Sequence, residues 1–368
     1  MNPWLIVAAL GFLQCFAVAW LLVPLVRDRA EALGLFDRPT LARKQHDRPI
    51  PRCGGLGIFP AFWGMLALNI ALATLVVPRL GFLPEGIRAL AANVGTKTGE
   101  LEALFLGSFI IFALGLLDDR FNLPPVVRLA VQVMACVPLL MGGVVLKVFL
   151  PPVIAWPLTV FWLVLLTNSF NFLDNMNGLT SGVSAIICGV MALIALLAQE
   201  WYMFLCFAML GGAVTGFWRY NFPKASVFLG DSGSTHLGFL LGGLAILSTY
   251  YQEGVPTRLP ILIPLVVMGL PLFDTISVMW IRWSSGKPLM EGDTNHVSHR
   301  LVALGMSRTM AVVFLYGVAL ATGLAAIPLR NLDVAHGIVQ VGVIFLIFFH
   351  LHWLERVSYR KSRVANSP

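Results

Sequence analysis

Residues 3–26 read PWLIVAALGFLQCFAVAWLLVPLV and contain no charged side chain. About 20 apolar residues in a helix are enough to cross the hydrocarbon core of a bilayer, so this stretch predicts a membrane-crossing helix. No basic stretch precedes it and no small-residue cleavage site is evident. We therefore expect a retained helix and not a removed signal peptide.

Apolar stretches of this length recur along all 368 residues, of which 58% are hydrophobic and 12% charged. A soluble protein would carry about a quarter charged residues, and a β-barrel would show alternating segments of about 10 residues. The sequence predicts an all-α polytopic membrane bundle, a single domain over 1–368 with a cytoplasmic tail at 354–368. We expect eleven spans, at about 3–26, 53–77, 101–118, 125–148, 153–171, 179–198, 201–218, 235–250, 261–281, 309–328 and 337–354.

Basic residues are distributed unevenly between the two sides of these spans. The loops at 27–52, 119–128, 219–224 and 282–308 and the tail after 354 hold 19 of the 25 Lys and Arg residues. Because basic loops stay in the cytoplasm, we expect a multi-pass protein of the cell (inner or plasma) membrane, with its N-terminus outside and its C-terminus cytoplasmic. Anionic lipid accounts for the net charge of +7, so no nucleic-acid partner is needed.

Five loops on the expected cytoplasmic side carry nearly all the unusual polar residues. They read KQHDRPIPRCGG (44–55), GLLDDRFNLPP (115–125), NSFNFLDNMNGL (168–179), YNFPKASVFLGDSGSTHLG (220–238) and GDTNHVSHRL (292–301). Since all five face one side, they can meet only at the cytoplasmic membrane surface. A transporter or channel would place such groups near the midplane instead.

The stretch FLGDSGSTHLG offers a carboxylate, Asp231, among three glycines. We expect Gly230, Gly233 and Gly238 to let the backbone approach a ligand closely. Mg²⁺ prefers one or two protein oxygens together with phosphates and waters, so Asp231 could hold a metal that holds a diphosphate. Taken alone, the stretch also fits a flexible loop with an N-capping aspartate.

Two other loops carry amide and carboxylate oxygens. Asn168, Asn171 and Asn175 repeat at helical spacing, which predicts one helix face suited to a divalent ion or to sugar hydroxyls. Asp118 and Asp119 end the third span and point about 100° apart, so they need not serve one task. Taken alone, these motifs also fit capping amides and an ordinary charge pair at a helix end.

The fifth loop has His296 and His299 three residues apart, followed by Arg300. No third or fourth ligand at matching spacing supports zinc, and cations that bind phosphate are the better interpretation. Asp274, inside the ninth span, needs a partner within the membrane, and we expect it to be a structural partner for a loop cation.

In this order the motifs resemble those of the polytopic polyprenyl-phosphate N-acetylhexosamine-1-phosphate transferases. The resemblance covers about 44–301 and rests on K-x-H-x-R-P-I-P-R-x-G-G, G-L-x-D-D-R, N-x-x-N-x-x-D-N-x-N-G-L, Y-N-F-P-x-A-x-V-F-L-G-D-S-G-S, P-L-F-D-T and D-x-x-H-x-x-H-R-L. It implies transfer of a sugar phosphate, most simply N-acetylglucosamine-1-phosphate, from a UDP-sugar to polyprenyl phosphate with release of UMP. Mg²⁺ is the implied cofactor, with Mn²⁺ as a substitute, and a homodimer is left open.

The resemblance also implies roles for individual residues. Asp118 and Asp119 would lie near the lipid phosphate, Lys44 near the nucleotide, and Phe228 would stack on uracil. The implied catalytic set is Asp118, Asp119, Asp174 and His299; the substrate-binding set is Lys44, Asn171, Asn175, Phe228, His296 and Arg300; and Asp231 with Asn171 would bind the metal.

Two positions depart from the family pattern. Ser298 stands where many members have the middle histidine of H-x-H-H-R, and Asn177 stands where many have aspartate. Roles that need a cation at 298 or a base at 177 therefore do not transfer. Three alternatives stay open at this stage: a UDP-N-acetylmuramoyl-pentapeptide phosphotransferase, a transporter of sugar nucleotides or lipid-linked sugars, and a binding protein without catalysis.

Overall fold

The computed structural model describes residues 3–37, 49–81, 85, 86, 88, 91, 98–146, 150–250, 257–288 and 295–365, with side chains as far as residue 354. Its α-helices are α1 (Pro3–Arg27), α2 (Ala30–Leu33), α3 (Gly54–Ala71), α5 (Thr98–Phe121), α6 (Pro125–Ala135), α7 (Val137–Met141), α8 (Pro152–Leu173), α9 (Leu179–Leu197), α10 (Trp201–Asn221), α11 (Asp231–Leu247), α12 (Ile263–Val267), α13 (Gly269–Ser284), α14 (Val297–Ala303), α15 (Arg308–Ala326) and α16 (Val334–Ala365). A π-helical turn η1 (Leu72–Val76) and the 3₁₀ turns η2 (Val77–Arg79), η4 (Leu259–Leu262) and η5 (Ile327–Arg330) extend or precede them, and β1 (Phe36–Asp37) pairs antiparallel with β2 (Ile50–Pro51).

Eight helical segments among the described residues are long and apolar enough to cross a membrane, in agreement with an all-α polytopic membrane protein. They are α1, α3 with η1 and η2, α5, α8, α9, α10, α15 with η5, and α16. A ninth is possible if η4–α12 and α13, which meet at a bend of 70°, form one broken span.

The predicted count of eleven spans is not confirmed. The stretch expected to cross at 125–148 is divided into α6 and the short α7, because Pro138 has no N–H to continue the hydrogen-bond ladder past Cys136. The stretch expected at 235–250 is α11, which starts four residues earlier, at Asp231, and is 17 residues long.

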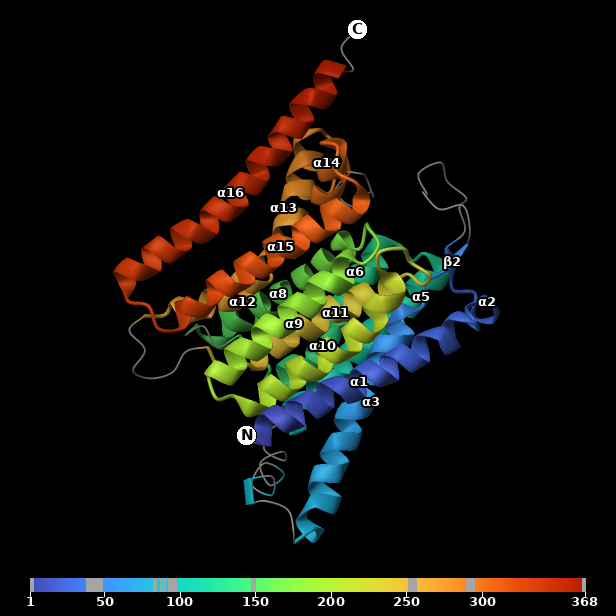
Figure 1. The fold of residues 1–368 in the computed structure, drawn as a ribbon, viewed down its shortest axis with the longest axis vertical. Coiled ribbons are helices and arrows are strands. Elements are labelled where there is room, and N and C mark those ends of the chain that lie inside the picture. Colours follow the sequence, from blue (N-terminus) through green and yellow to red (C-terminus); the bar gives the residue numbers. More distant parts are fainter. Residues whose placement is uncertain are drawn as a thin grey trace.

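Helix α11 lies at the centre of the bundle (Figure 1). All of its residues except Asp231 are buried. It packs against α8, α5 and α3. Glycines permit this close packing: a Cβ on Gly238 would lie 2.4 Å from the Leu166 carbonyl oxygen of α8, and one on Gly243 would lie 2.3 Å from the Leu104 side chain of α5. The core of the protein is therefore built around the sequence that contains the glycine-rich motif.

The contacts along α11 show in which direction each neighbouring helix runs. Gly115 of α5 meets Ser232, whereas Gly107, about two turns earlier in the same helix, meets Phe239, so α5 runs antiparallel to α11. Helix α8 is also antiparallel, since its Asn171 meets Asp231 and its Leu166 meets Gly238. Helix α3 runs parallel, because its first turn, at Gly55, meets Ser232. The start of α3, the ends of α5 and α8 and the start of α11 therefore lie at one end of the bundle.

The chain before α3 is joined to the chain before α11 by main-chain hydrogen bonds. The Phe228 N–H donates to the Pro51 carbonyl at 2.8 Å, and the Gly54 N–H donates to the Phe228 carbonyl at 3.0 Å. The first and fourth motif loops thus form one short layer over that end of the bundle.

Helices α13 to α16 form the other side of the molecule (Figure 1). Helix α16 lies along the edge and touches α14 and α15. Only 17% of its most apolar stretch of 18 residues is buried. The far end of α3 projects away from the bundle on the opposite side (Figure 1). These apolar surfaces are those expected to contact lipid.

Candidate functional site

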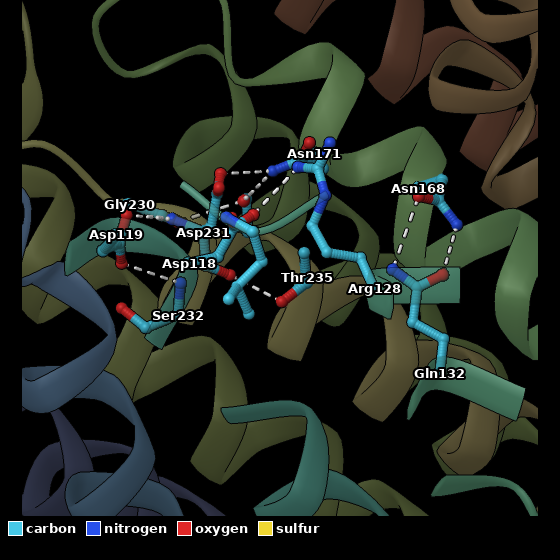
Figure 2. Close-up of polar contacts among 12 residues, drawn as sticks. Asp118, Asp119, Arg128, Gln132, Asn168, Asn171, Gly230, Asp231, Ser232 and Thr235 are labelled. Carbon is cyan, nitrogen blue, oxygen red and sulfur yellow. Dashed lines mark hydrogen bonds and ion pairs between the residues drawn. The ribbon is translucent and has the colours of Figure 1, made fainter. Parts of the chain in front are cut away.

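The first turn of α11 is where three motif loops meet (Figure 2). Asn171, near the end of α8, donates from Nδ2 to Oδ1 of Asp231 at 2.6 Å and to the Ser234 hydroxyl at 3.1 Å. Ser234 donates in turn to the Gly230 carbonyl at 3.0 Å. This network fixes the orientation of the Asp231 carboxyl group relative to α8.

Asp119 approaches the same turn from α5. Its Oδ1 accepts the Asp231 N–H at 2.8 Å and its Oδ2 accepts the Ser232 N–H at 3.0 Å (Figure 2). Gly230, with φ of +73°, leads the chain into the helix at this point. Asp119 is therefore the capping group of α11, although it lies 112 residues away in sequence.

Asp118, one residue earlier, faces a different partner. Its Oδ2 forms an ion pair with Nη1 of Arg128 at 2.8 Å, and its Oδ1 accepts the Leu123 N–H at 2.7 Å. The Asp118 carboxyl also lies beside that of Asp231. The sequence left open whether Arg120 or Arg128 would pair with the aspartates, and the structure selects Arg128.

Asp174 and Asn175 follow the end of α8. Asp174 is half-buried beside the Thr180 hydroxyl. Burial raises the pKa of its carboxyl to about 7; the nearby Thr180 hydroxyl lowers this pKa and the negative charge of Asp119 raises it. Asn175 accepts a hydrogen bond from Ser298, at the start of α14. The third and fifth motif loops are thus in direct contact.

The start of α14 is held against α13 and α8. Asp274 of α13 lies 2.8 Å from Nδ1 of His296 and accepts the Val297 N–H at 2.7 Å, and the His296 ring packs edge-on against Phe172. Asp274 therefore has the structural role that the sequence predicts for it.

The two remaining basic residues of this loop are half-buried. Arg300 donates to the Ser277 hydroxyl on α13, and the ring of His299 lies 6.4 Å from the ring of His296. The predicted contact of His299 and Arg300 with a diphosphate stays a prediction.

Phe228 lies on the layer formed by the first and fourth loops. Its main chain is bound to Pro51 and Gly54, and its side chain is half-buried. Lys44, the cation predicted to lie near a nucleotide, falls outside the described residues. The predicted stacking of Phe228 on a base stays a prediction.

Comparison with known proteins agrees with this arrangement. Residues 101–249, which carry the second, third and fourth motif loops, match glycosyl transferase family 4. Over 357 residues the chain is 29% identical to the probable undecaprenyl-phosphate N-acetylglucosaminyl 1-phosphate transferase of Bacillus subtilis strain 168, with 95% of this chain and 91% of that protein covered. The chain is therefore similar, over nearly its whole length, to the polyprenyl-phosphate N-acetylhexosamine-1-phosphate transferases that its motifs resemble. It is a phosphoglycosyltransferase.

Two further relatives support the same assignment. The decaprenyl-phosphate N-acetylglucosaminephosphotransferase of Mycolicibacterium smegmatis is 28% identical, with 82% of this chain and 75% of that protein covered. The undecaprenyl-phosphate alpha-N-acetylglucosaminyl 1-phosphate transferase of Salmonella typhi is 26% identical, with 95% of this chain and 90% of that protein covered.

An apolar groove of about 910 Å³ leads away from the polar end of this transferase. Helices α6, α8 and α13 line it, and Arg128, Asn168 and Asn171 form its polar end. Along its length it is lined by exposed apolar side chains such as Val153 and Phe161. A single groove therefore has a polar end with one cation and two amides, and an apolar lining along the rest of its length.

The motif glycines have a different use from the one that the sequence predicted. A Cβ on Gly230 would lie 2.7 Å from Oδ2 of Asp119, one on Gly233 would lie 2.4 Å from the Leu229 side chain, and one on Gly238 would meet the Leu166 carbonyl. These three glycines make room for other parts of the protein itself and not for a ligand, so that expectation was wrong.

The predicted single face of amides is also wrong. Helix α8 ends at Leu173, so Asn175 lies beyond it, in the following turn. Asn168 and Gln132 of α6 exchange side-chain amide hydrogen bonds of 2.7 and 3.4 Å, which join α8 to α6 (Figure 2). Of the three asparagines, only Asn171 contacts Asp231 in the hydrogen-bond network of the α11 turn.

Sequence reasoning missed Arg282. It was counted only among the basic residues of a cytoplasmic loop, yet its side chain is 2% exposed, and its guanidinium lies 5.3 Å from the centre of the Phe172 ring. A cation over an aromatic face is stabilised electrostatically, most strongly where water is excluded. In the sequence, Arg282 stands at the end of an apolar span, as solvent-exposed basic residues commonly do, so nothing there indicated that it is buried.

The donors at the α11 turn fit Mg²⁺ bound together with phosphate. No three His, Cys, Asp or Glu side chains within the described part of the chain are arranged to hold an ion by themselves. Asp231 supplies hard carboxylate oxygens and the Asp118 carboxyl adjoins it, whereas Asn171 presents its Nδ2 to Asp231 and would add its Oδ1 only with its amide group turned over. Mg²⁺ commonly takes one or two carboxylates and completes its shell with substrate phosphates and waters, so this smaller donor set is sufficient.

Proposed function

We propose that this enzyme transfers N-acetylglucosamine-1-phosphate from UDP-N-acetylglucosamine to a polyprenyl phosphate at a membrane surface and releases UMP. The observation that carries the proposal is the groove whose polar end is formed by Arg128 and Asn171 and whose length is apolar. A polyprenyl phosphate matches this groove, because its charged phosphate would lie at the polar end and its isoprenoid chain along the apolar length. The names of relatives from several bacteria support the polyprenyl-phosphate acceptor and the N-acetylglucosamine phosphate group, and the UDP-linked donor is part of the proposal.

The groove favours a lipid acceptor over a soluble one. Its exposed apolar side chains, among them Val153, Trp156 and Phe161, would be unfavourable in water but are favourable in contact with hydrocarbon chains. Burial of each CH₂ group of a lipid contributes about 0.8 kcal/mol, so a polyprenyl chain along the groove would bind strongly. Arg128 would attract the phosphate head to the polar end.

Asp231 and Asn171 would hold Mg²⁺, which when bound would offset the negative charge of the donor diphosphate. Arg128 would orient the acceptor phosphate, and Phe228 would bind the uracil. His299 and Arg300 would add positive charge near the diphosphate. Because these groups are half-buried, each such interaction is stronger than it would be in open water.

In the proposed reaction, an oxygen of the polyprenyl phosphate forms a bond to the sugar-linked β-phosphorus. The bond from that phosphorus to the bridging oxygen breaks, and UMP leaves with this oxygen. A phosphate monoester has a second pKa near 6, so the attacking group is largely ionised at neutral pH and no strong base is needed. Positioning and charge neutralisation then supply most of the rate.

The test is an assay of UMP release by the purified protein in lipid nanodiscs that contain undecaprenyl phosphate and Mg²⁺, with a panel of UDP-sugars. We expect UMP with UDP-N-acetylglucosamine and none without the lipid phosphate. Asp231→Asn should abolish this turnover while the protein stays folded. Asp28→Asn, which alters an exposed carboxylate paired with Arg27, is the matched control and should retain activity. Full Mg²⁺-dependent activity of Asp231→Asn would refute the metal assignment.

We also propose that the site faces the cytoplasm, because 19 of the 25 basic residues lie in the loops on its side of the expected topology. In sealed inverted vesicles, UDP-N-acetylglucosamine added outside should then react without detergent. Reaction only in right-side-out vesicles would contradict this orientation.

A further inference from the structure

Asp119 is enclosed by the first turn of α11. Each of its oxygens accepts one main-chain N–H, from Asp231 and Ser232, and the residue is 6% exposed. Gly230 covers it on another side, since a Cβ there would lie 2.7 Å from Oδ2 and 3.0 Å from Oδ1. The Ser232 hydroxyl is also adjacent to the carboxyl group. The carboxyl group is therefore directed at the chain and not at the groove.

The neighbouring aspartate is arranged differently. Asp118 pairs with Arg128, which lines the groove, and it adjoins the Asp231 carboxyl. Successive helical residues point about 100° apart, which explains how one dipeptide can serve two partners. The structure thus divides the Asp118–Asp119 pair into one group that faces the polar end of the groove and one that faces a helix terminus.

The contacts of Asp119 bear directly on Asp231. The first amides of a helix have no partner within the helix, and they carry partial positive charge that a carboxylate stabilises. By accepting the N–H of Asp231 itself, Asp119 fixes the main chain of that residue, while Asn171 fixes its side chain from α8 at 2.6 Å. The orientation of the Asp231 carboxyl therefore depends on two groups from two different helices.

We propose that Asp119 is a positioning residue that acts through Asp231, and that it is neither a ligand of the metal nor the nucleophile of the reaction. This inference rests on the proposed function, in which Asp231 holds a divalent cation. Removing the cap would let the first turn of α11 relax. Affinity for the cation would fall, while the chemistry at saturating cation would persist.

The experiment measures Mn²⁺ binding by electron paramagnetic resonance without substrates, and UMP formation over a Mg²⁺ titration, for wild type and Asp119→Asn. Asparagine keeps one acceptor oxygen but loses the charge and the second acceptor. Caps of this kind are worth about a factor of ten, so we expect about ten-fold weaker Mn²⁺ binding and a similar rise in the half-saturating Mg²⁺ concentration. The kcat at saturating Mg²⁺ should stay within about five-fold of wild type.

Gly230→Ala provides a second route that leaves Asp119 intact. Its methyl group would displace the carboxyl from the helix terminus, so this variant should show the same weakening of Mn²⁺ binding. The double variant should be no weaker than the single ones if both act through the same turn. This arm keeps the inference testable if Asp119→Asn fails to fold.

A kcat for Asp119→Asn reduced about a thousand-fold at saturating Mg²⁺, with unchanged Mn²⁺ affinity, would overturn the inference and assign Asp119 to the chemistry. Loss of all Mn²⁺ binding, as expected for Asp231→Asn, would instead make it a ligand and also overturn the inference. Wild type that binds Mn²⁺ but forms no UMP with any UDP-sugar would refute the proposed function alone, because the binding arm would still report the role of Asp119.

Discussion

Gly115→Ala tests whether the close contact between α5 and α11 sets the geometry of the site. A Cβ at this position would lie 2.4 Å from Cα and 2.5 Å from N of Ser232, and 2.7 Å from the carbonyl carbon of Asp231. Ordinary contacts of a Cβ begin at 3.4 Å, so the two helices would have to separate by about 1 Å. All three contacts are with main chain, so no side chain can rotate away to relieve the overlap.

The expected effects follow from that displacement. Overpacking of this kind costs about 1–3 kcal/mol of stability, which should lower the thermal midpoint by several degrees. A displacement of about 1 Å also moves Asp118 and Asp119, on α5, away from Asp231, and misplacement on this scale can cost about 100-fold in rate. We therefore expect activity to fall about 100-fold while the variant still folds.

The assay is UMP release in nanodiscs together with the thermal unfolding midpoint in the same preparation. Gly189→Ala on α9 and Gly64→Ala on α3 are matched controls, since an added Cβ at either position meets nothing within 4 Å. Both should be as active and as stable as wild type or slightly more stable. If Gly115→Ala were also indistinguishable from wild type, tight packing of α5 on α11 would not control the site.

Three further variants test other parts of the structure. Phe228→Ala should weaken UDP binding about 5- to 100-fold by calorimetry, because base stacking contributes about 1–3 kcal/mol while the main-chain bonds to Pro51 and Gly54 remain; unchanged affinity would remove the stacking role. Burial raises the pKa of Asp174 to about 7, so its contribution to folding stability is complete below about pH 4 and is lost as the pH rises to 7. The thermal midpoint of wild type should therefore fall more between pH 5 and 8 than that of Asp174→Asn. An equal fall in the two proteins would contradict a raised pKa for Asp174. Val160→Trp should narrow the groove and raise KM for undecaprenyl phosphate at least about ten-fold with little change in KM for the UDP-sugar, whereas an unchanged lipid KM would exclude the groove as the acceptor site.

Membrane class and the convergence of the motif loops could be predicted from the sequence, because both depend on local composition. A long run without charged residues indicates a helix that lies in the hydrocarbon core of the bilayer. Polar motifs at the ends of such helices on one side can meet only on that side of the bilayer. The contacts of Asp231 with Asn171 and of Asn175 with Ser298 agree with that reasoning. The roles of these residues in binding and catalysis stay predictions.

Tertiary packing decided what the sequence could not. The capping of α11 by Asp119 joins residues 112 positions apart, and no local pattern signals it. Gly230 looked like a ligand-binding glycine because contact with a ligand and contact with Asp119 both require the same missing Cβ. Arg282 looked like a solvated loop cation because burial depends on the position of Phe172, in another helix. The count of eleven spans is not confirmed, since Pro138 and the bend between α12 and α13 interrupt apolar runs that read as continuous in the sequence.

The lateral opening of the groove has a kinetic consequence. Val153 and Phe161, which line it, are 78% and 62% exposed, so the groove is open along its side to the surrounding bilayer. A lipid that enters from the side encounters the protein by diffusion in two dimensions. Its effective concentration is then its mole fraction among the membrane lipids and not its amount per litre. Adding inert phospholipid should slow the enzyme at a constant bulk quantity of acceptor, as in surface dilution, whereas adding buffer should not.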